Sequence, residues 1–392
     1  MKIKNICIVN VNQQGLGIGG VETVSYILKE EFESYGFTVS CLYANQKTTK
    51  SNSDFIFPHK KEIGHKKNLS FLISLIREKG IELIILEGGY KDVLVDLCIK
   101  AKIETGIKLI LPIHFNPQVA VKEYDDYKER ILNKCSNPFK KLLKNIYCEI
   151  KRIFYTRRTL TLVKDTILKY DIKNIDAIVS LNEKYSDFLK SVYSKEIHKK
   201  IHTIRNPIQT TLSKTPIKDN IVLFVGRLTY QKRLDRLLYI WKTISNKNPE
   251  WQLVIVGDGE YANEYKQLAQ SLQLKNIIFV GQQISEKYFQ KSKIVCMTSS
   301  HEALPMVLIE AQLWNCVPIA YNSFESATDV IQNGHNGILV TPFKQKEYTK
   351  ALSTLITNNE LREQLATNGK EFIEKFDSKV VIKEWINLIE SL

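Results

Sequence analysis

Short, almost wholly apolar segments alternate with longer amphipathic segments along most of this chain. In the first half the apolar runs are KNICIVNV, IELIILEG, IKLILPIHF and IDAIVSLN, and in the second half they are NIVLFVG, WQLVIVG, NIIFVG, KIVCMTS, VPIAYN and NGILV. Strands that are apolar at nearly every position are typical of parallel sheets, in which a crossover helix follows each strand and helices cover both faces. The pattern therefore predicts an α/β protein.

The alternation is interrupted once, at residues 203–220, where TIRNPIQTTLSKTPIKDN contains two prolines and no periodicity. A chain of 392 residues is long enough for two domains. We predict a first domain over 1–205, a second over 206–375 and a C-terminal amphipathic helix over 376–392. The apolar positions of that helix follow helical spacing at Val380, Ile382, Trp385, Ile386 and Ile389.

The composition, 44% hydrophobic and 25% charged, is that of a folded soluble protein. Seven scattered cysteines without a CxxC pair predict reduced thiols, as in a cytoplasmic protein. The chain opens on MKIKNICIVNVN, which we interpret as a first strand and not as a signal peptide. Since no stretch reaches the roughly 18–20 apolar residues of a membrane span, any contact with a membrane is expected to be peripheral.

A formal charge of +14 suggests an acidic partner, and many of the basic residues lie within residues 122–173. Over 139–158 they alternate with apolar residues at helical spacing, which suits the surface of an anionic membrane. The apolar positions are Phe139, Leu142, Leu143, Ile146, Tyr147, Ile150, Ile153 and Phe154, and the cations of the wider segment are Lys140, Lys141, Lys144, Lys151, Arg152, Arg157, Arg158 and Lys164. An ordinary helix packed on its own domain is the alternative. Nucleic acid is not expected, because no nucleic-acid-binding motif accompanies the charge.

The first strand is followed by GLGIGGVE, a loop that matches GxGxxG and leads into a predicted helix. Such a loop lets backbone N–H groups approach a phosphate. A dinucleotide fold would also place an acidic residue at the end of the second strand, to bind the ribose. That strand reads FTVSCLYANQ and has no carboxylate, so we do not expect NAD.

In the second half, Gly226 ends one strand, Arg227 follows it, and Lys232 lies near the start of the next helix. Two cations at the carboxyl end of a parallel strand predict a diphosphate site. The next strand ends at Gly257, in VIVGDGEY, where a tight turn allows the close approach of a nucleoside.

A further motif, SSHEALPMVLIEA, places Glu302 in a loop and Glu310 in the helix after it. The carboxylates can accept hydrogen bonds from sugar hydroxyls. The backbone N–H groups of the intervening loop are expected to receive a phosphate. This loop comprises Ala303, Leu304, Pro305 and Met306.

Taken together, GRLTYQKRLDRLL, VIVGDGE, IIFVGQ, HEALPMVLIEA, VPIAYN and NGHNGILV resemble the donor-binding domain of family 4 retaining glycosyltransferases. The resemblance covers residues 203–375. In the first half it rests on GGVE, IHFNP and IVSLNEKY and is weaker. It implies a GT-B fold, in which two Rossmann-like domains face each other across a cleft and the first domain binds the acceptor.

The resemblance also implies roles for individual residues. Arg227 and Lys232 would neutralise the diphosphate leaving group, which stabilises charge that develops as the glycosidic bond breaks. Glu310 would hold the ribose hydroxyls and Glu302 the donor sugar. Three residues of the first domain would also contribute: Gly19 and Gly20 at the phosphates, and His114 near the transferred sugar. The sequence departs from the family at Ala303, where relatives have glycine.

The expected enzyme is therefore a retaining, metal-independent hexosyltransferase without a cofactor. It would use a nucleotide sugar, with UDP the expected nucleotide, and a lipid-linked or cell-envelope glycan as acceptor. It would act at the inner face of the plasma membrane. Two alternatives remain open from the sequence: a GT-B enzyme acting on a small soluble acceptor or as an epimerase, and a non-catalytic membrane-associated binding subunit.

Overall fold

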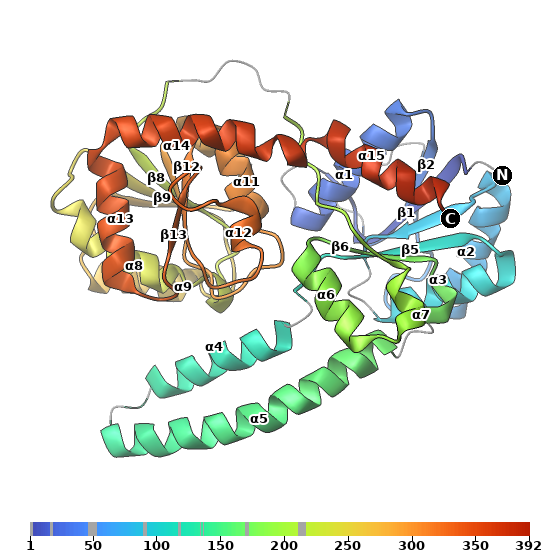
Figure 1. Ribbon diagram of the computed structural model, residues 1–392, viewed down its shortest axis with the longest axis horizontal. Helices are drawn as coiled ribbons and strands as arrows, with labels where there is room; N and C mark the ends of the chain where they lie inside the picture. The colour runs from blue at the N-terminus through green and yellow to red at the C-terminus, as the bar shows by residue number, and fades with distance from the viewer. Residues whose placement is uncertain are drawn as a thin grey trace. The chain divides into compact units, whose positions relative to one another are not determined.

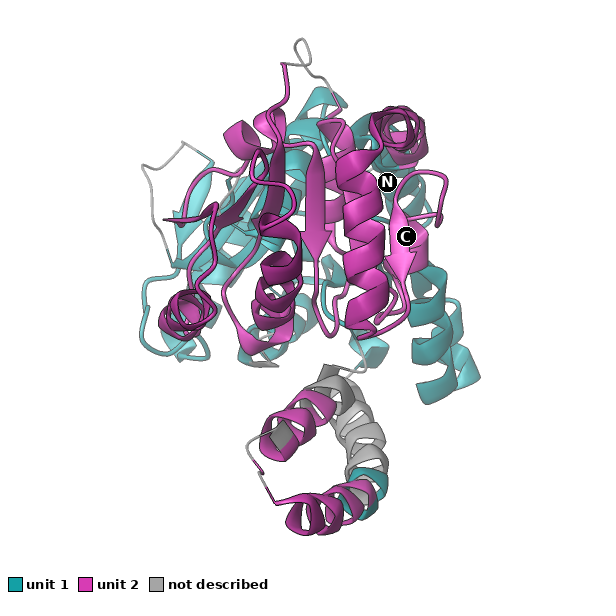
Figure 2. Cartoon of the chain, turned by 90° about the vertical axis from the view of Figure 1, so that its left-hand side faces the viewer, with its two compact units in different colours: residues 1–118, 150–209, 376–392 teal, residues 119–149, 210–375 magenta. Residues whose placement is uncertain are grey.

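The computed structural model describes the chain except residues 1–2, 16–18, 46–52, 89–91, 117–118, 134, 136, 169–171 and 211–216. Side chains at 92, 119–123, 133 and 154–168 also lie outside the described part. The chain forms two compact units, one comprising 1–118, 150–209 and 376–392, and the other 119–149 and 210–375 (Figure 2). We call them unit 1 and unit 2.

In the described residues, unit 1 contains a seven-stranded parallel sheet in the order β3-β2-β1-β4-β5-β6-β7 (Figure 1). Its strands are β1 (Asn5–Asn12), β2 (Thr38–Asn45), β3 (Asp54–Ile56), β4 (Leu83–Leu86), β5 (Lys108–Ile113), β6 (Ala177–Ser180) and β7 (Ile201–Thr203). Its helices are α1 (Gly20–Ser34), α2 (Lys66–Lys79), α3 (Asp92–Thr105), η1 (Ile172–Asn174), α6 (Glu183–Val192), α7 (Lys195–His198) and α15 (Ser378–Glu390).

Unit 2 contains a six-stranded parallel sheet in the order β10-β9-β8-β11-β12-β13. Its strands are β8 (Ile221–Val225), β9 (Gln252–Val256), β10 (Ile277–Gly281), β11 (Ile294–Met297), β12 (Val317–Tyr321) and β13 (Ile338–Val340). Its helices include η2 (Tyr230–Lys232), α8 (Leu234–Ser245), α9 (Ala262–Ser271), α10 (Glu286–Lys291), α11 (Met306–Leu313), α12 (Ala327–Val330), α13 (Gln345–Thr357), α14 (Asn359–Phe372) and η3 (Ile373–Phe376).

The predicted α/β class with two Rossmann-like parallel sheets is confirmed. Central strands such as β4, β11 and β12 are buried at every residue, because helices cover both faces of each sheet. Each unit has its own core, and Trp241 on α8 is one of the largest fully buried side chains. Burial of one large apolar side chain stabilises a fold by roughly 1.5–3 kcal/mol, so these cores account for two separately compact units.

Two further helices lie between β5 and η1 in sequence: α4 (Val119–Asn133) and α5 (Pro138–Leu168), of which residues 150–168 belong to unit 1. They lie side by side (Figure 1), and the Tyr124 hydroxyl of α4 donates a hydrogen bond to the Cys148 carbonyl of α5 at 3.1 Å. We expected the whole segment 122–173 within the first domain, but 119–149 groups with unit 2. The physical reason is a set of ion pairs between α4 and other segments of unit 2, described below.

The C-terminal helix α15 lies beside α1 in unit 1 (Figure 1). Trp385 packs edge-on against Phe32 at 6.3 Å between ring centroids, and the Ser378 hydroxyl donates to Glu31 at 2.5 Å. One predicted core position is wrong: Val380 is exposed, because the buried face of the helix runs through Val381 instead.

Two further observations concern the cysteines and the helices. All seven cysteines are free, and every one except Cys135 is buried. Among the helices of the described part, none combines the length and the apolar character needed to cross a membrane.

Candidate active site

The carboxyl ends of β8 and β9 meet at one edge of the unit 2 sheet, where several predicted donor residues lie. Gly226 and Arg227 follow β8, and Gly257 follows β9. Gly257 has a φ of 136°, and a Cβ there would lie 1.9 Å from the carbonyl oxygen of Gly226. This close approach of two strand ends therefore requires glycine. Arg227 is exposed, and no side chain in the described residues binds its guanidinium.

Lys232 and Glu302 form an ion pair beside this edge. Lys232 Nζ lies 2.6 Å from Glu302 Oε1, and the two side chains are only 19% and 9% exposed. The lysine passes close to Gly226, since its Cε is 3.6 Å from the position of a Cβ at that glycine. The structure thus brings together the cation predicted for the diphosphate and the carboxylate predicted for the sugar.

Two chain segments running alongside each other hold this ion pair in place. The N–H of Ser300 donates to the Gln231 carbonyl at 2.8 Å, and Gln231 Nε2 donates to the His301 carbonyl at 2.6 Å. Gln231 precedes Lys232 in η2, and His301 precedes Glu302. The relative position of the two charged groups is therefore set by one backbone and one side-chain hydrogen bond, made by residues within two positions of the pair.

Glu310 lies on α11, the helix that follows this loop, and is partly buried. Burial raises the pKa of its carboxyl to about 7. Among the described residues no side chain hydrogen-bonds to it. A partly buried carboxylate without a side-chain partner is a suitable acceptor for ligand hydroxyl groups.

The loop between the two glutamates offers fewer free N–H groups than we predicted. Pro305 has no N–H, and the Met306 N–H donates to the Leu304 carbonyl at 2.9 Å. Leu304 is buried, and Ala303 already has an interaction. Pro305 and Met306 therefore drop out of the four peptide groups predicted to receive a phosphate.

In unit 1, His114 follows β5 and Glu87 follows β4, so the two side chains meet at the carboxyl edge of that sheet. His114 Nε2 donates a hydrogen bond to Glu87 Oε2. Both side chains are buried, and neither His114 Nδ1 nor Glu87 Oε1 has a partner in the described part. Each side chain therefore has one polar atom without a hydrogen-bond partner in the described part, and a ligand could bind these two atoms.

Gly19 and Gly20 lie at the start of α1, as its N-cap and first residue. Residues 16–18 of the same loop lie outside the described residues. Glu22 accepts a hydrogen bond from Asn12 at 2.9 Å, and its other carboxylate oxygen is 2.3 Å from the position of a Cβ at Gly19. The end of α1 predicted to bind phosphate therefore already holds a carboxylate of its own, at the positive end of the helix dipole.

Several polar residues next to the unit 2 site were not predicted from the sequence, namely Asp126, Glu129, Arg233, Ser300 and His301. Ser300 and His301 stand within the SSHEALP motif, and Arg233 directly follows Lys232. The sequence offered no comparable signal for the two acids on α4. It also missed Glu87, although a carboxylate directly after the apolar run IELIIL is a strand-end signal of the kind that selected Arg227.

One group of side chains in the described residues has the composition of a metal site: His59, Glu62 and His65, in the loop before α2. The two imidazole rings stack at 4.0 Å with 7° between their planes. Their Nδ1 atoms accept hydrogen bonds from the N–H groups of Glu62 and Lys67. Parallel stacked rings do not direct their lone pairs to one point, so this arrangement suits an ion poorly.

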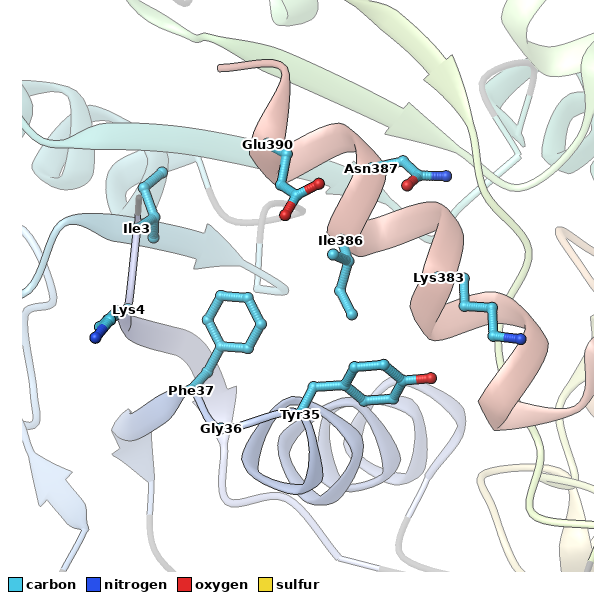
Figure 3. Close-up of a pocket in the computed structure, with 9 residues that line it drawn as sticks. All are labelled: Ile3, Lys4, Tyr35, Gly36, Phe37, Lys383, Ile386, Asn387 and Glu390. Carbon is cyan, nitrogen blue, oxygen red and sulfur yellow. The ribbon is translucent and has the colours of Figure 1, made fainter. Parts of the chain in front are cut away.

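A cavity of about 450 Å³ in unit 1 contains none of the predicted residues (Figure 3). Phe37 and Tyr35, from the α1–β2 turn, face Ile386 and Glu390 of α15 across it. It adjoins the amino ends of β1 and β2, whereas His114 and Gly19 follow carboxyl ends.

The chain is similar to known proteins at the level of a family, of curated relatives and of solved structures. Residues 209–372 match the family described as Glycosyl transferases group 1. The chain is 34% identical over 175 residues to the amylovoran biosynthesis glycosyltransferase AmsD of Erwinia amylovora, covering 44% of this chain and 48% of that protein.

A second relative is an α-1,4-N-acetyl-D-galactosaminyltransferase of Campylobacter jejuni, whose name gives GalNAc-α-(1→4)-GalNAc-α-(1→3)-diNAcBac-PP-undecaprenol as the substrate. It is 28% identical over 207 residues, which cover 50% of this chain and 56% of that protein. The chain spans about half the length of these curated relatives.

Among solved structures, the fold is similar to that of Anabaena Alr3699/HepE, crystallised with UDP and glucose. The TM-score is 0.73 at 14% identity, with 99% of this chain and 100% of that chain covered. The likeness extends over both units, and such neighbours have the GT-B fold.

Proposed function

We propose that this chain is a retaining glycosyltransferase that moves a hexose or N-acetylhexosamine from a UDP-sugar to a lipid-linked or cell-envelope glycan. The observation that carries the proposal is the Lys232–Glu302 ion pair at the carboxyl edge of the unit 2 sheet, within the part of the chain that matches group 1 glycosyltransferases. Open α/β sheets bind ligands at the carboxyl ends of their strands.

In the proposed reaction Arg227 and Lys232 neutralise the departing UDP. Arg227 is exposed and has no partner among the described residues, so it is free to bind an anion. A buried ion pair contributes little net stability, because desolvation offsets the attraction. Separating the pair would leave Glu302 buried without its cation, so a diphosphate that binds Lys232 and sugar hydroxyls that bind Glu302 must together replace the lost contact.

Glu310 is proposed to hold the ribose, and Gly19 and Gly20 to approach the phosphates through the backbone at the start of α1. His114, oriented by Glu87, would bind a hydroxyl of the transferred sugar through Nδ1. The cations take the place of a metal ion, and no cofactor is required. We propose that the configuration at the sugar is retained because the acceptor attacks from the face on which UDP departs. This route needs no carboxylate nucleophile.

The acceptor is inferred from the relatives and from the surface of α5. The two relatives above are named for amylovoran biosynthesis and for an undecaprenol-linked substrate. On α5, apolar side chains project into solvent, with Phe139 69%, Tyr147 63% and Ile153 60% exposed. Exposed cations lie between them, at Lys140, Lys141, Lys144, Lys151 and Arg152.

We propose that this basic and apolar face binds an anionic membrane from the cytoplasmic side. A helix with its apolar residues in water loses the stabilisation of burial, and a lipid interface restores it. Glu149 is the one acid between Lys140 and Arg152, so the charge of this helix complements an acidic leaflet. Phe154, Arg157, Arg158 and Lys164 belong to the same predicted surface, but their side chains lie outside the described residues.

The proposal is tested by thermal-shift and hydrolysis measurements against a panel of nucleotide sugars. A UDP-sugar at a hundredfold excess over its Kd should raise the thermal midpoint by about 5 °C or more. It should also be hydrolysed slowly, and transferred when an undecaprenyl-diphosphate-linked sugar is added. Binding without hydrolysis or transfer would favour a non-catalytic subunit. If no nucleotide sugar shifts the midpoint, the proposed function is wrong.

A further inference from the structure

Asp126 on α4 contacts the segment that carries Glu302. Its Oδ2 accepts a hydrogen bond from the Ser300 hydroxyl at 2.6 Å and lies 3.5 Å from Nδ1 of His301. Asp126, Ser300 and His301 are all buried. The motif glutamate is the next residue along this segment.

Glu129, one turn further along α4, contacts the segment that carries Lys232. Its carboxylate lies 2.6 Å from an Arg233 nitrogen and 2.8 Å from an Arg236 nitrogen. Burial alone would raise the pKa of Glu129, but the hydrogen bonds and positive charges of these arginines lower it overall. Glu129 is therefore held as a carboxylate between two cations.

The contact between Glu129 and Arg233 affects the position of Lys232, because Arg233 is the next residue in the chain. It directly follows Lys232 and has a φ of 47°, a left-handed conformation that costs a non-glycine residue about 1–2 kcal/mol. Its buried guanidinium lies over the Tyr230 ring at 4.8 Å and also pairs with Asp235 at 3.0 Å. The backbone turn that aims Lys232 is thus held in place by a side chain that Glu129 binds.

We propose that α4 is a clamp for the donor site, in which Asp126 and Glu129 are positioning residues. Each acid holds the chain neighbour of one member of the Lys232–Glu302 pair. The inference rests on the proposed function, since it assigns both acids to the same donor site. Asp126 controls the loop with the sugar-binding carboxylate, and Glu129 controls the turn with the diphosphate-binding lysine.

The clamp predicts different kinetic effects for its two halves. Asp126→Ala should lower kcat for the hydrolysis of UDP-N-acetylglucosamine by about tenfold, the loss expected when a hydrogen bond to a charged group is removed. The affinity for UDP should change by less than about threefold, because Glu302 does not bind the nucleotide. Glu129→Gln should instead weaken UDP about tenfold in calorimetry.

A double-mutant cycle and two controls separate positioning from general stability. Asp126→Ala combined with Ser300→Ala should be no worse than either single variant, because both remove the same bond. Asp126→Asn keeps an acceptor for Ser300 and should restore most of kcat. Lys128→Ala is the matched control, since Lys128 also lies on α4 but pairs with Glu149 of α5. This variant should leave kcat and UDP affinity near wild type.

Hydrogen exchange at residues 299–303 tests the clamp without any ligand. Exchange there should be faster in Asp126→Ala and Ser300→Ala than in Lys128→Ala. Unchanged exchange, additive effects in the double variant, or a lowered thermal midpoint with kcat and UDP affinity both unchanged would overturn the inference. If the wild-type protein does not bind UDP, the proposed function fails, and the exchange measurement still decides whether α4 holds the loop.

Discussion

Lys232 has two competing partners once a donor is present: the Glu302 carboxylate that it binds in this structure and the diphosphate proposed for it. Arg227, by contrast, is exposed and makes no ion pair within the described residues. A bound donor must therefore displace Glu302 from Lys232, whereas it displaces no carboxylate of the described residues from Arg227. At the residue scale, this difference sets the expected results of mutation.

Replacement of Arg227 or Lys232 by Ala should lower transfer on the order of 10²–10³-fold, the usual effect of removing one group that stabilises developing charge. Lys232→Ala also leaves Glu302 buried without its cation, so the thermal midpoint should fall in this variant and not in Arg227→Ala. Steady-state kinetics and thermal melts measure both effects. Transfer within a few-fold of wild type in both variants would contradict the diphosphate assignment.

The raised pKa of Glu310, about 7, predicts a pH dependence of nucleotide binding. Ribose hydroxyls donate to the ionised carboxylate, so UDP should bind more tightly as the pH rises from 6 to 8. Calorimetry with Glu310→Gln is the control, since the ionisation of the nucleotide phosphate near pH 6 affects both proteins alike. An identical pH profile in the two proteins would exclude Glu310 from the ribose site.

The same shift affects the stability of the unliganded protein. Because the folded pKa lies above the unfolded value, the contribution of Glu310 to stability is fully present below about pH 4.5 and is lost as the pH rises through 7. Relative to Glu310→Gln, the wild-type thermal midpoint should therefore fall over this interval.

At the scale of elements, the neighbouring helices α4 and α5 have different surroundings. The amphipathic spacing predicted over 139–158 lies on α5, which leaves apolar side chains in solvent, whereas α4 directs Asp126 and Glu129 toward other segments of unit 2. An ordinary helix packed on its own domain would bury those apolar side chains. The exposed face is the basis for the proposed membrane contact.

Changing Lys140, Lys141, Lys144 and Lys151 to Ser should release the protein from vesicles that contain acidic lipid. Each cation near such a surface is worth up to about 1 kcal/mol, so four changes remove up to about 4 kcal/mol of the attraction. UDP affinity should be unchanged, which serves as the control for folding. If co-sedimentation is indifferent both to these changes and to high salt, the membrane proposal fails.

At the scale of the whole molecule, the two parallel-sheet units have the GT-B fold. In the proposed mechanism, side-chain cations replace a divalent metal. Transfer should therefore persist in excess EDTA, measured with the donor selected by the nucleotide-sugar panel. A complete loss that Mg²⁺ or Mn²⁺ restores would contradict the assignment of Arg227 and Lys232.

The sequence by itself determined the α/β class, the two sheets and the positions of residues at strand ends. These features depend on local periodicity, because a strand buried on both faces must be apolar along its length. The same logic located Gly226, Arg227 and Gly257, and motif spacing located Glu302 and Glu310.

Only the tertiary structure decided which of these groups meet. The pairing of Lys232 with Glu302, the contact of Glu87 with His114 and the grouping of α4 with unit 2 all join residues far apart along the chain. Periodicity specifies which face of an element is buried but not its partner. The pKa of Glu310 likewise follows from burial by surrounding segments. The charges of the site were visible in the sequence, whereas their partners depended on how the elements pack.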